Sequence, residues 1–274
     1  MKFGVVLPDL DARLLASFAQ DAEAAGWDAV FTWDGIGGGI NPWVALTAVA
    51  MATTRLRFGT MLTAPTRRRP WQLASETATL DRLSNGRLIL AVGLGAIDTG
   101  FDKYGEATER KIRAKRLDES LEIITRLWSA EPFSYKGEHY NLREVVGQKP
   151  AQSPRVPIWV VGALGYEKSL NRVARYDGLL PAKLAEDHSL LPVFPDDLKV
   201  MKGYIEGKRS NSFPLDVVME AETPGDDQAK AVEIIQPFVD AGTTWWLESV
   251  WDTPWKQGGL EGMRQRVKQG HAII

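Results

Sequence analysis

The sequence contains no cysteine and only three histidines, His139, His188 and His271, which lie far apart along the chain. The lack of cysteine excludes disulfides, iron–sulfur clusters, thiol nucleophiles and cysteine-ligated zinc. Because the histidines are scattered, no paired or triad spacing of metal ligands exists, and we expect no metal site. The absence of cysteine also fits a cytoplasmic protein, which is the location we expect.

A strong charge imbalance and long apolar runs are also missing. The 274 residues carry a net charge of −2, and 44% of them are hydrophobic. Without a basic excess, the composition gives no sign of a nucleic-acid partner or of a polybasic membrane-binding segment. No apolar run approaches the ~18 residues of a transmembrane helix. The apolar run at the start of the chain is too short for a signal peptide. We therefore expect an ordinary folded protein whose partner is neither nucleic acid nor a membrane.

The most informative stretch is residues 70–95. Apolar residues recur at helical spacing over 71–83, and an Asn-Gly pair then supplies the positive-φ residue that ends a helix. Residues 88–92 form a continuous apolar run, which is typical of a strand covered on both faces. Gly93 and Gly95 follow at its carboxyl end, where parallel α/β folds bind their ligands.

Strand and helix patterns alternate along the whole chain. Eight segments are predicted as strands: 3–7, 28–33, 56–62, 87–92, 157–161, 177–180, 215–221 and 244–250. Each precedes a segment with helical spacing, and this count predicts an α/β protein, a (β/α)8 TIM barrel with a single domain over 1–274. Two insertions are expected after the fourth strand, at about 96–110 and 130–157, the second with a short hairpin at 133–142.

Carboxylates follow several of the predicted strands, at the end of the barrel that forms its mouth. Asp34, after the second strand, is the candidate catalytic residue, since it could hydrogen-bond a ligand or accept a proton. Its alternative role is that of a loop or helix-capping aspartate. Glu220, Glu222 and Glu248 follow the last two strands, and Glu220 with Glu248 could form the carboxylate pair of a glycosidase.

Glycines flank the predicted mouth at two places. Gly93 and Gly95 would let the backbone approach a flat ring or a phosphate, or they would only turn the chain. Gly162-Ala163 precedes a helix whose N-terminus could bind phosphate, or it forms an ordinary turn. A GxG string alone lacks the third glycine of a dinucleotide fingerprint, so these glycines do not by themselves identify a ligand.

Several charged residues near the third and fourth predicted strands are expected to have structural roles. The run Arg67–Arg69 is predicted to be a solvated face, with attraction of an anionic ligand as the alternative. Asp81 and Arg87 flank the tight turn at the end of the barrel opposite the mouth. We therefore expect them to form a structural ion pair.

Four segments together resemble the luciferase-like monooxygenase superfamily, whose members use FMN or the deazaflavin F420 on a (β/α)8 barrel. The resemblance covers nearly the whole chain. The segments are ATLDRLSNGRLILAVGLG, RLDESLEIITRLWSAEPFSYKGEHYNL, VPIWVVGALGYEKSLNRVARYDGLLP and AGTTWWLESVW. The first two are the more specific, since they match the family's "LD.LS.GR" turn and its long helix with a following "GEHY" hairpin.

The resemblance implies roles for the residues at the mouth. Asp34 would lie near the pyrimidine or reactive face of the flavin. Thr60-Met61 would form a bulge in the third strand, often with a non-proline cis peptide, behind the ring. Gly93 and Gly95 would line the ring, and Gly162-Ala163 would meet the phosphate end of the cofactor.

The resemblance also implies a flavin-dependent oxidoreductase of the monooxygenase type that acts on a small organic substrate. Many members carry a histidine where this chain has Gly35. Because F420-dependent hydride transfer often relies on that histidine, FMN is slightly favoured, and an F420-dependent reductase or dehydrogenase is the alternative. A non-catalytic flavin-binding protein and a glycosidase are the alternatives of another class. We also expect a homodimer.

Overall fold

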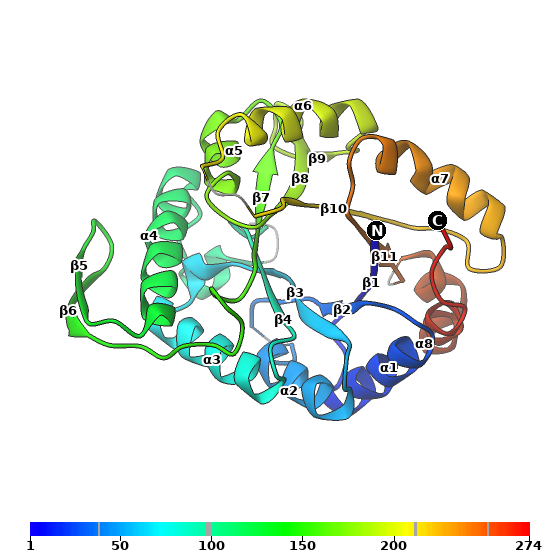
Figure 1. The fold of residues 1–274 in the computed structure, drawn as a ribbon, viewed down its shortest axis with the longest axis horizontal. Helices are drawn as coiled ribbons and strands as arrows, with labels where there is room; N and C mark the ends of the chain where they lie inside the picture. Colours follow the sequence, from blue (N-terminus) through cyan, green and yellow to red (C-terminus); the bar gives the residue numbers. More distant parts are fainter. Residues whose placement is uncertain (38, 97–99, 211–212, 251) are drawn as a thin grey trace.

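The computed structural model describes all residues except 38, 97–99, 211–212 and 251. Eight parallel strands form its centre: β1 (Lys2–Leu7), β2 (Ala29–Thr32), β3 (Arg57–Thr63), β4 (Leu88–Val92), β7 (Ile158–Ala163), β8 (Gly178–Leu184), β10 (Asp216–Ala221) and β11 (Trp245–Ser249). Each strand pairs with the next, β11 pairs with β1, and β10 pairs with β8, so the sheet closes on itself (Figure 1). The predicted TIM barrel is confirmed.

Eight α-helices surround this barrel (Figure 1). They are α1 (Ala12–Ala24), α2 (Pro42–Ala52), α3 (Pro70–Leu83), α4 (Arg110–Ser129), α5 (Glu167–Val173), α6 (Pro195–Glu206), α7 (Gln228–Asp240) and α8 (Thr253–Lys268). Asn41 caps α2, as its side chain accepts hydrogen bonds from two backbone N–H groups of the first turn. In the described part of the chain, no helix is long and apolar enough to cross a membrane.

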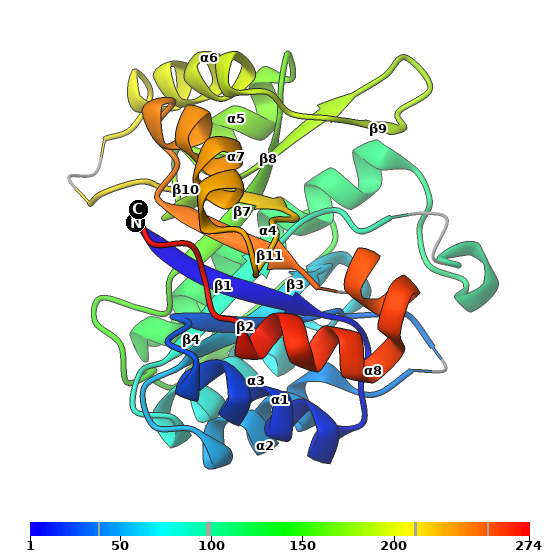
Figure 2. The same ribbon diagram turned by 90° about the vertical axis from the view of Figure 1, so that its right-hand side faces the viewer.

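Short elements decorate the connections. The predicted hairpin is present as β5 (Phe133–Lys136) and β6 (Asn141–Val145). The first expected insertion holds the short helix η3 (Asp102–Tyr104), and part of it, 97–99, lies outside the described residues. The sequence did not predict β9 (Leu190–Leu191), a two-residue strand antiparallel to β8. Figure 2 shows the barrel from the side, with the carboxyl ends of the strands at the right and both termini at the left.

Side chains fill the barrel completely at its centre. Alternate residues of the strands point inward and form a buried cluster that includes Val6, Phe31, Ile89, Trp159, Trp245 and Leu247. The rings of Trp159 and Trp245 meet edge to face with centroids 5.1 Å apart. The other strand residues face the helices in a larger apolar core, which explains why the strands read as continuous apolar runs. The filled centre therefore leaves no room for a ligand inside the barrel itself.

The end of the barrel opposite the mouth shows one wrong prediction. In the part of the chain that the structure describes, Asp81 and Arg87 form no direct ion pair. Asp81 is fully buried and instead accepts hydrogen bonds from the backbone N–H groups of Ala151 and Gln152 at 2.8 and 2.9 Å. Arg87 donates to the carbonyl of Ala50 in α2. Both charges are satisfied by backbone groups that are distant in sequence, so both residues remain structural.

Candidate active site at the barrel mouth

The floor of the mouth is apolar. Met61, Leu62 and Val161 are partly exposed and lie on the buried cluster that fills the barrel. A side chain at Gly93 would meet the methyl groups of Val161 and Leu62 at 3.0 and 3.1 Å, so glycine is needed here for close packing of the floor. Leu62 and Val161 were not predicted as site residues. The inward alternation of their strands was the signal that would have found them.

The third strand carries the irregularity that the resemblance implied. Its register with β4 shifts between Thr60 and Thr63, and the hydroxyls of these two threonines lie 2.7 Å apart. The non-proline cis peptide joins Met61 to Leu62, one bond later than expected. Thr60 itself still pairs in register with both neighbouring strands, so the ladder breaks only after it.

Asp34 is held by two arginines. The η1 helix (Pro65–Arg67) follows β3, and it brings Arg67 and Arg68 to within 2.9 Å of the Asp34 carboxylate, whose side chain is only 1% exposed. Arg68 donates to both carboxylate oxygens, and Arg67 also donates to the Asp34 carbonyl. These contacts fix η1 against the end of β2. The catalytic role of Asp34 stays a prediction, since its carboxylate already serves this ion pair.

The prediction of a solvated face for Arg67–Arg69 is wrong for two of the three residues. The Arg67 and Arg68 side chains are 8% and 20% exposed, because the buried Asp34 carboxylate requires neighbouring positive charge. Burial lowers the pKa of the Arg67 guanidinium from its usual value, and the charge of Asp34 opposes that shift. Arg69 alone remains exposed.

Gly95 is required by the loop itself. Its φ is +79°, and a side chain here would come within 2.6 Å of the Phe101 ring. Arg113 donates to the Leu94 and Gly95 carbonyls at 3.0 and 2.8 Å and so fixes this turn. The contacts with Phe101 and Arg113 explain the glycine without a cofactor. Its predicted contact with a flavin ring remains a prediction.

Gly162 and Ala163 lie at the end of β7, as the sequence indicated. A side chain at Gly162 would come within 2.7 Å of Leu179 and 3.1 Å of Leu170, so this glycine lets α5 pack against the barrel wall. The Ala163 N–H donates to the Ser169 hydroxyl at 2.8 Å. That N–H therefore already has a partner within the protein, and the predicted phosphate contact is not shown by this geometry.

The carboxylates of the last two strands do not converge. Val218 and Leu247 point into the barrel, so the alternation of the strands turns Glu220 inward and Glu248 outward. Glu248 is 1% exposed and forms an ion pair with Arg266 of α8 at 3.1 Å. The predicted Glu220–Glu248 pair of a glycosidase is therefore wrong, because the barrel wall separates the two side chains.

The end of β2 leaves open space. No atom lies within 4 Å of the position that a Cβ of Gly35 would take. The neighbouring Trp33 is 37% exposed. A bulkier residue would therefore fit at position 35, where the resemblance led us to look for a histidine and this chain has glycine.

Comparison with known proteins agrees with this architecture. A family model described as luciferase-like monooxygenase matches residues 1–259. An F420-dependent glucose-6-phosphate dehydrogenase of Amycolatopsis mediterranei is 37% identical over 162 residues, which are 56% of this chain and 48% of the relative. The chain thus spans about half the length of that relative. A second protein of that name, from Kineococcus radiotolerans, is 31% identical over 236 residues, 80% of this chain and 66% of the relative.

Among solved structures, the coenzyme F420-dependent tetrahydromethanopterin reductase of Methanopyrus kandleri superposes with a TM-score of 0.77. The two sequences are 18% identical, and the match covers 98% of each chain, so this likeness shows a shared fold. The family model, by contrast, matches almost the entire sequence. The protein is a member of the luciferase-like monooxygenase family, whose relatives are F420- or FMN-dependent oxidoreductases.

Proposed function

We propose that this protein is an F420-dependent oxidoreductase that transfers hydride between the deazaflavin and a small organic substrate. The observation that carries the proposal is the identity of 31% shared with an F420-dependent dehydrogenase along 80% of this chain. FMN, which the sequence slightly favoured, becomes the second candidate. The unfilled space at Gly35 supports FMN, since no imidazole is present there to assist hydride transfer.

The mouth fits a flat, largely apolar ring. Met61, Leu62 and Val161 provide an apolar floor, and Gly93 carries no side chain that would stand above it. When bound, the cofactor supplies the hydride chemistry, whereas the protein supplies binding, orientation and exclusion of water. The floor residues would hold the ring on one face. Asp34 would act through η1, which it keeps in place beside the ring.

Replacing Met61 with aspartate tests the position of the ring. A carboxylate on the floor would have to lose its hydration under an apolar ring, so we expect the affinity for F420 to fall at least tenfold, about 1.4 kcal/mol. Fluorescence titration of the deazaflavin measures this. Ile273→Asp, at a residue that is 82% exposed, is the matched control and should bind as the wild type does. Equal affinity of the Met61 variant and the wild type would reject the proposed floor.

We also propose that the protein forms a homodimer through α2. This helix has no charged residue in its eleven positions, PWVALTAVAMA, and Thr47 is its one polar side chain. Val44 and Met51, two turns apart, are nonetheless 65% and 68% exposed. A helix with so few polar residues is normally buried, so a second copy of this uncharged face is the partner that fits.

Aspartates at Val44 and Met51 together are expected to yield a monomer. Each charge would have to be buried against the same charged face of the other copy, which disfavours association. Analytical ultracentrifugation at micromolar concentration measures the mass of both proteins. The control is Leu83→Asp with Ile273→Asp, both at exposed residues outside α2, which should keep the wild-type mass. A monomeric wild type would refute the dimer.

A further inference from the structure

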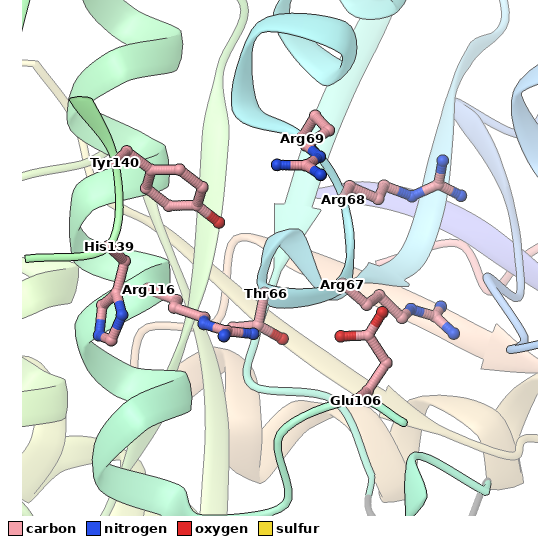
Figure 3. A pocket seen from close by; sticks show the side chains of 8 residues that line it. All are labelled: Thr66, Arg67, Arg68, Arg69, Glu106, Arg116, His139 and Tyr140. Carbon is pink, nitrogen blue, oxygen red and sulfur yellow. The ribbon is translucent and has the colours of Figure 1, made fainter. Parts of the chain in front are cut away.

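A cavity of about 320 Å3 lies beside the mouth. It is enclosed by η1 and the residues after it, by α4 and by the tip of the β5–β6 hairpin (Figure 3). We name it the arginine pocket, after lining residues that include Thr66, Arg67, Arg69, Glu106, Arg116 and Tyr140. The floor residues Met61, Leu62 and Val161 do not line it, whereas Arg67–Arg69, for which the sequence left attraction of an anionic ligand as an alternative, do.

Two of the arginines there are already neutralised. Arg67 and Arg68 turn their guanidinium groups away from the centre of the cavity (Figure 3). Both groups form ion pairs with Asp34. Glu106 lies beside Arg67, and its charge acts on that guanidinium (Figure 3). The carboxylates near the pocket are thus balanced by Arg67 and Arg68 and leave the remaining arginines uncompensated.

Arg69 and Arg116 extend their guanidinium groups into the cavity from opposite sides (Figure 3). Arg69 lies over the Trp71 ring, with 5.7 Å between the guanidinium carbon and the ring centroid, which fixes its direction. Across the residues that the structure describes, no carboxylate forms an ion pair with Arg69 or Arg116. Two guanidinium groups that face one space repel each other unless an anion lies between them.

Neutral donors complete the wall. Thr66 is 5% exposed, and its buried hydroxyl has no hydrogen-bond partner within the described structure. The Tyr140 hydroxyl points into the same cavity (Figure 3). A buried hydroxyl without a partner costs free energy, which a ligand with several acceptor oxygens would recover. The two hydroxyls and the two guanidinium groups come from three separate segments, so they approach such a ligand from different directions.

We propose that the arginine pocket is a binding site for a phosphate group, free or carried on a small molecule. Guanidinium groups match the oxygens of phosphate with paired hydrogen bonds, and Arg69 and Arg116 would provide both charges. Thr66 and Tyr140 would donate to the remaining oxygens. The site does not depend on the proposed function, because neither the cofactor nor the floor of the mouth takes part in it.

Calorimetry and thermal unfolding with inorganic phosphate test the site without any flavin or deazaflavin. We expect saturable binding and a higher unfolding temperature in phosphate than in chloride of equal ionic strength. Arg116→Ala and Arg69→Ala should each weaken phosphate at least tenfold. Arg13→Ala, at an exposed arginine of α1, should bind as the wild type does. If Arg116→Ala fails to fold, Arg116→Lys replaces it; lysine keeps the charge but loses the paired geometry, and weaker binding is again expected.

Three results would overturn the proposal. The first is the absence of saturable phosphate binding to the wild type at millimolar concentration. The second is an equal loss in Arg13→Ala, which would show general electrostatic attraction. The third is equal or tighter binding of succinate, which would assign the pocket to carboxylates. A small phosphomonoester in place of inorganic phosphate distinguishes the two phosphate sources, and tighter binding of the ester would assign the pocket to a phosphorylated molecule.

Discussion

Replacing Glu248 with alanine is expected to lower the free energy of unfolding by about 3–5 kcal/mol, because it leaves a buried arginine without its counter-charge. Glu248 accepts hydrogen bonds from the N–H and the hydroxyl of Thr223, each at 2.6 Å. Arg266, 6% exposed, pairs with Glu248 at 3.1 Å and also donates to the Gly270 carbonyl at 2.7 Å. This network fastens α8 to the barrel.

Urea unfolding of the wild type and of Glu248→Ala measures the loss. Glu233→Ala is the control, since the Glu233 side chain is 69% exposed in its pair with Lys230 and should change stability by less than about 0.5 kcal/mol. A Glu248 variant as stable as the wild type would contradict the structural role.

The contribution of Glu248 to the stability of the fold should decrease as the pH rises. Burial raises the pKa of Glu248 above its usual 4.5, and Arg266 and Thr223 oppose that shift. The folded protein therefore holds this proton more tightly than the unfolded chain does. The resulting stability is complete below pH 4.5 and is lost as the pH rises through the folded pKa. We expect the stability of the wild type, relative to Glu248→Gln, to decrease over that interval in urea unfolding at stepped pH.

Asp34→Ala is expected to cost about 3 kcal/mol of stability, since its removal leaves two arginines unpaired in a mostly buried position. The Asp34 side chain is 1% exposed, and its Arg67 partner is 8% exposed. Asp196→Ala is the control because the Asp196 side chain is 91% exposed. Its expected loss is below about 0.5 kcal/mol.

The same variant separates two roles of Asp34. If Asp34 holds η1, both stability and affinity for the cofactor should fall, and Asp34→Glu should restore part of each. If it acts only as an acid or base, turnover should fall while unfolding in urea stays unchanged. That second pattern would show that the ion pair with Arg67 and Arg68 contributes little.

The barrel could be predicted from sequence because each strand and helix is encoded by a pattern within its own short segment. The run at 88–92 is apolar at every position, as a strand between barrel interior and helices must be. Asn41, a residue type that favours helix N-termini, lies just before α2 and caps it. Two-residue β9 carries no such pattern and was missed. Helix α8 contains a kink at Gly259, which the sequence did not predict.

The site was harder to predict because its determinants are distant in sequence. In the sequence, Asp34 has no neighbouring basic residue. Its partners Arg67 and Arg68 lie 33 and 34 residues away and come close to it only when η1 folds against the end of β2. From sequence alone, Gly162 was compatible with a phosphate site or with an ordinary turn, and its contacts with Leu179 and Leu170 now account for the glycine. Sequence patterns thus predict where the mouth lies. Only the three-dimensional contacts distinguish the residues that face the mouth from those that support it.

Equilibrium titration of the purified protein with F420 and with FMN tests the central claim most directly. The account predicts that F420 binds in the micromolar range and at least tenfold more tightly than FMN, and that Met61→Asp weakens it. Tighter binding of FMN would contradict the choice of cofactor in favour of the monooxygenase alternative. If neither compound bound at micromolar concentration, the proposed oxidoreductase function itself would be wrong.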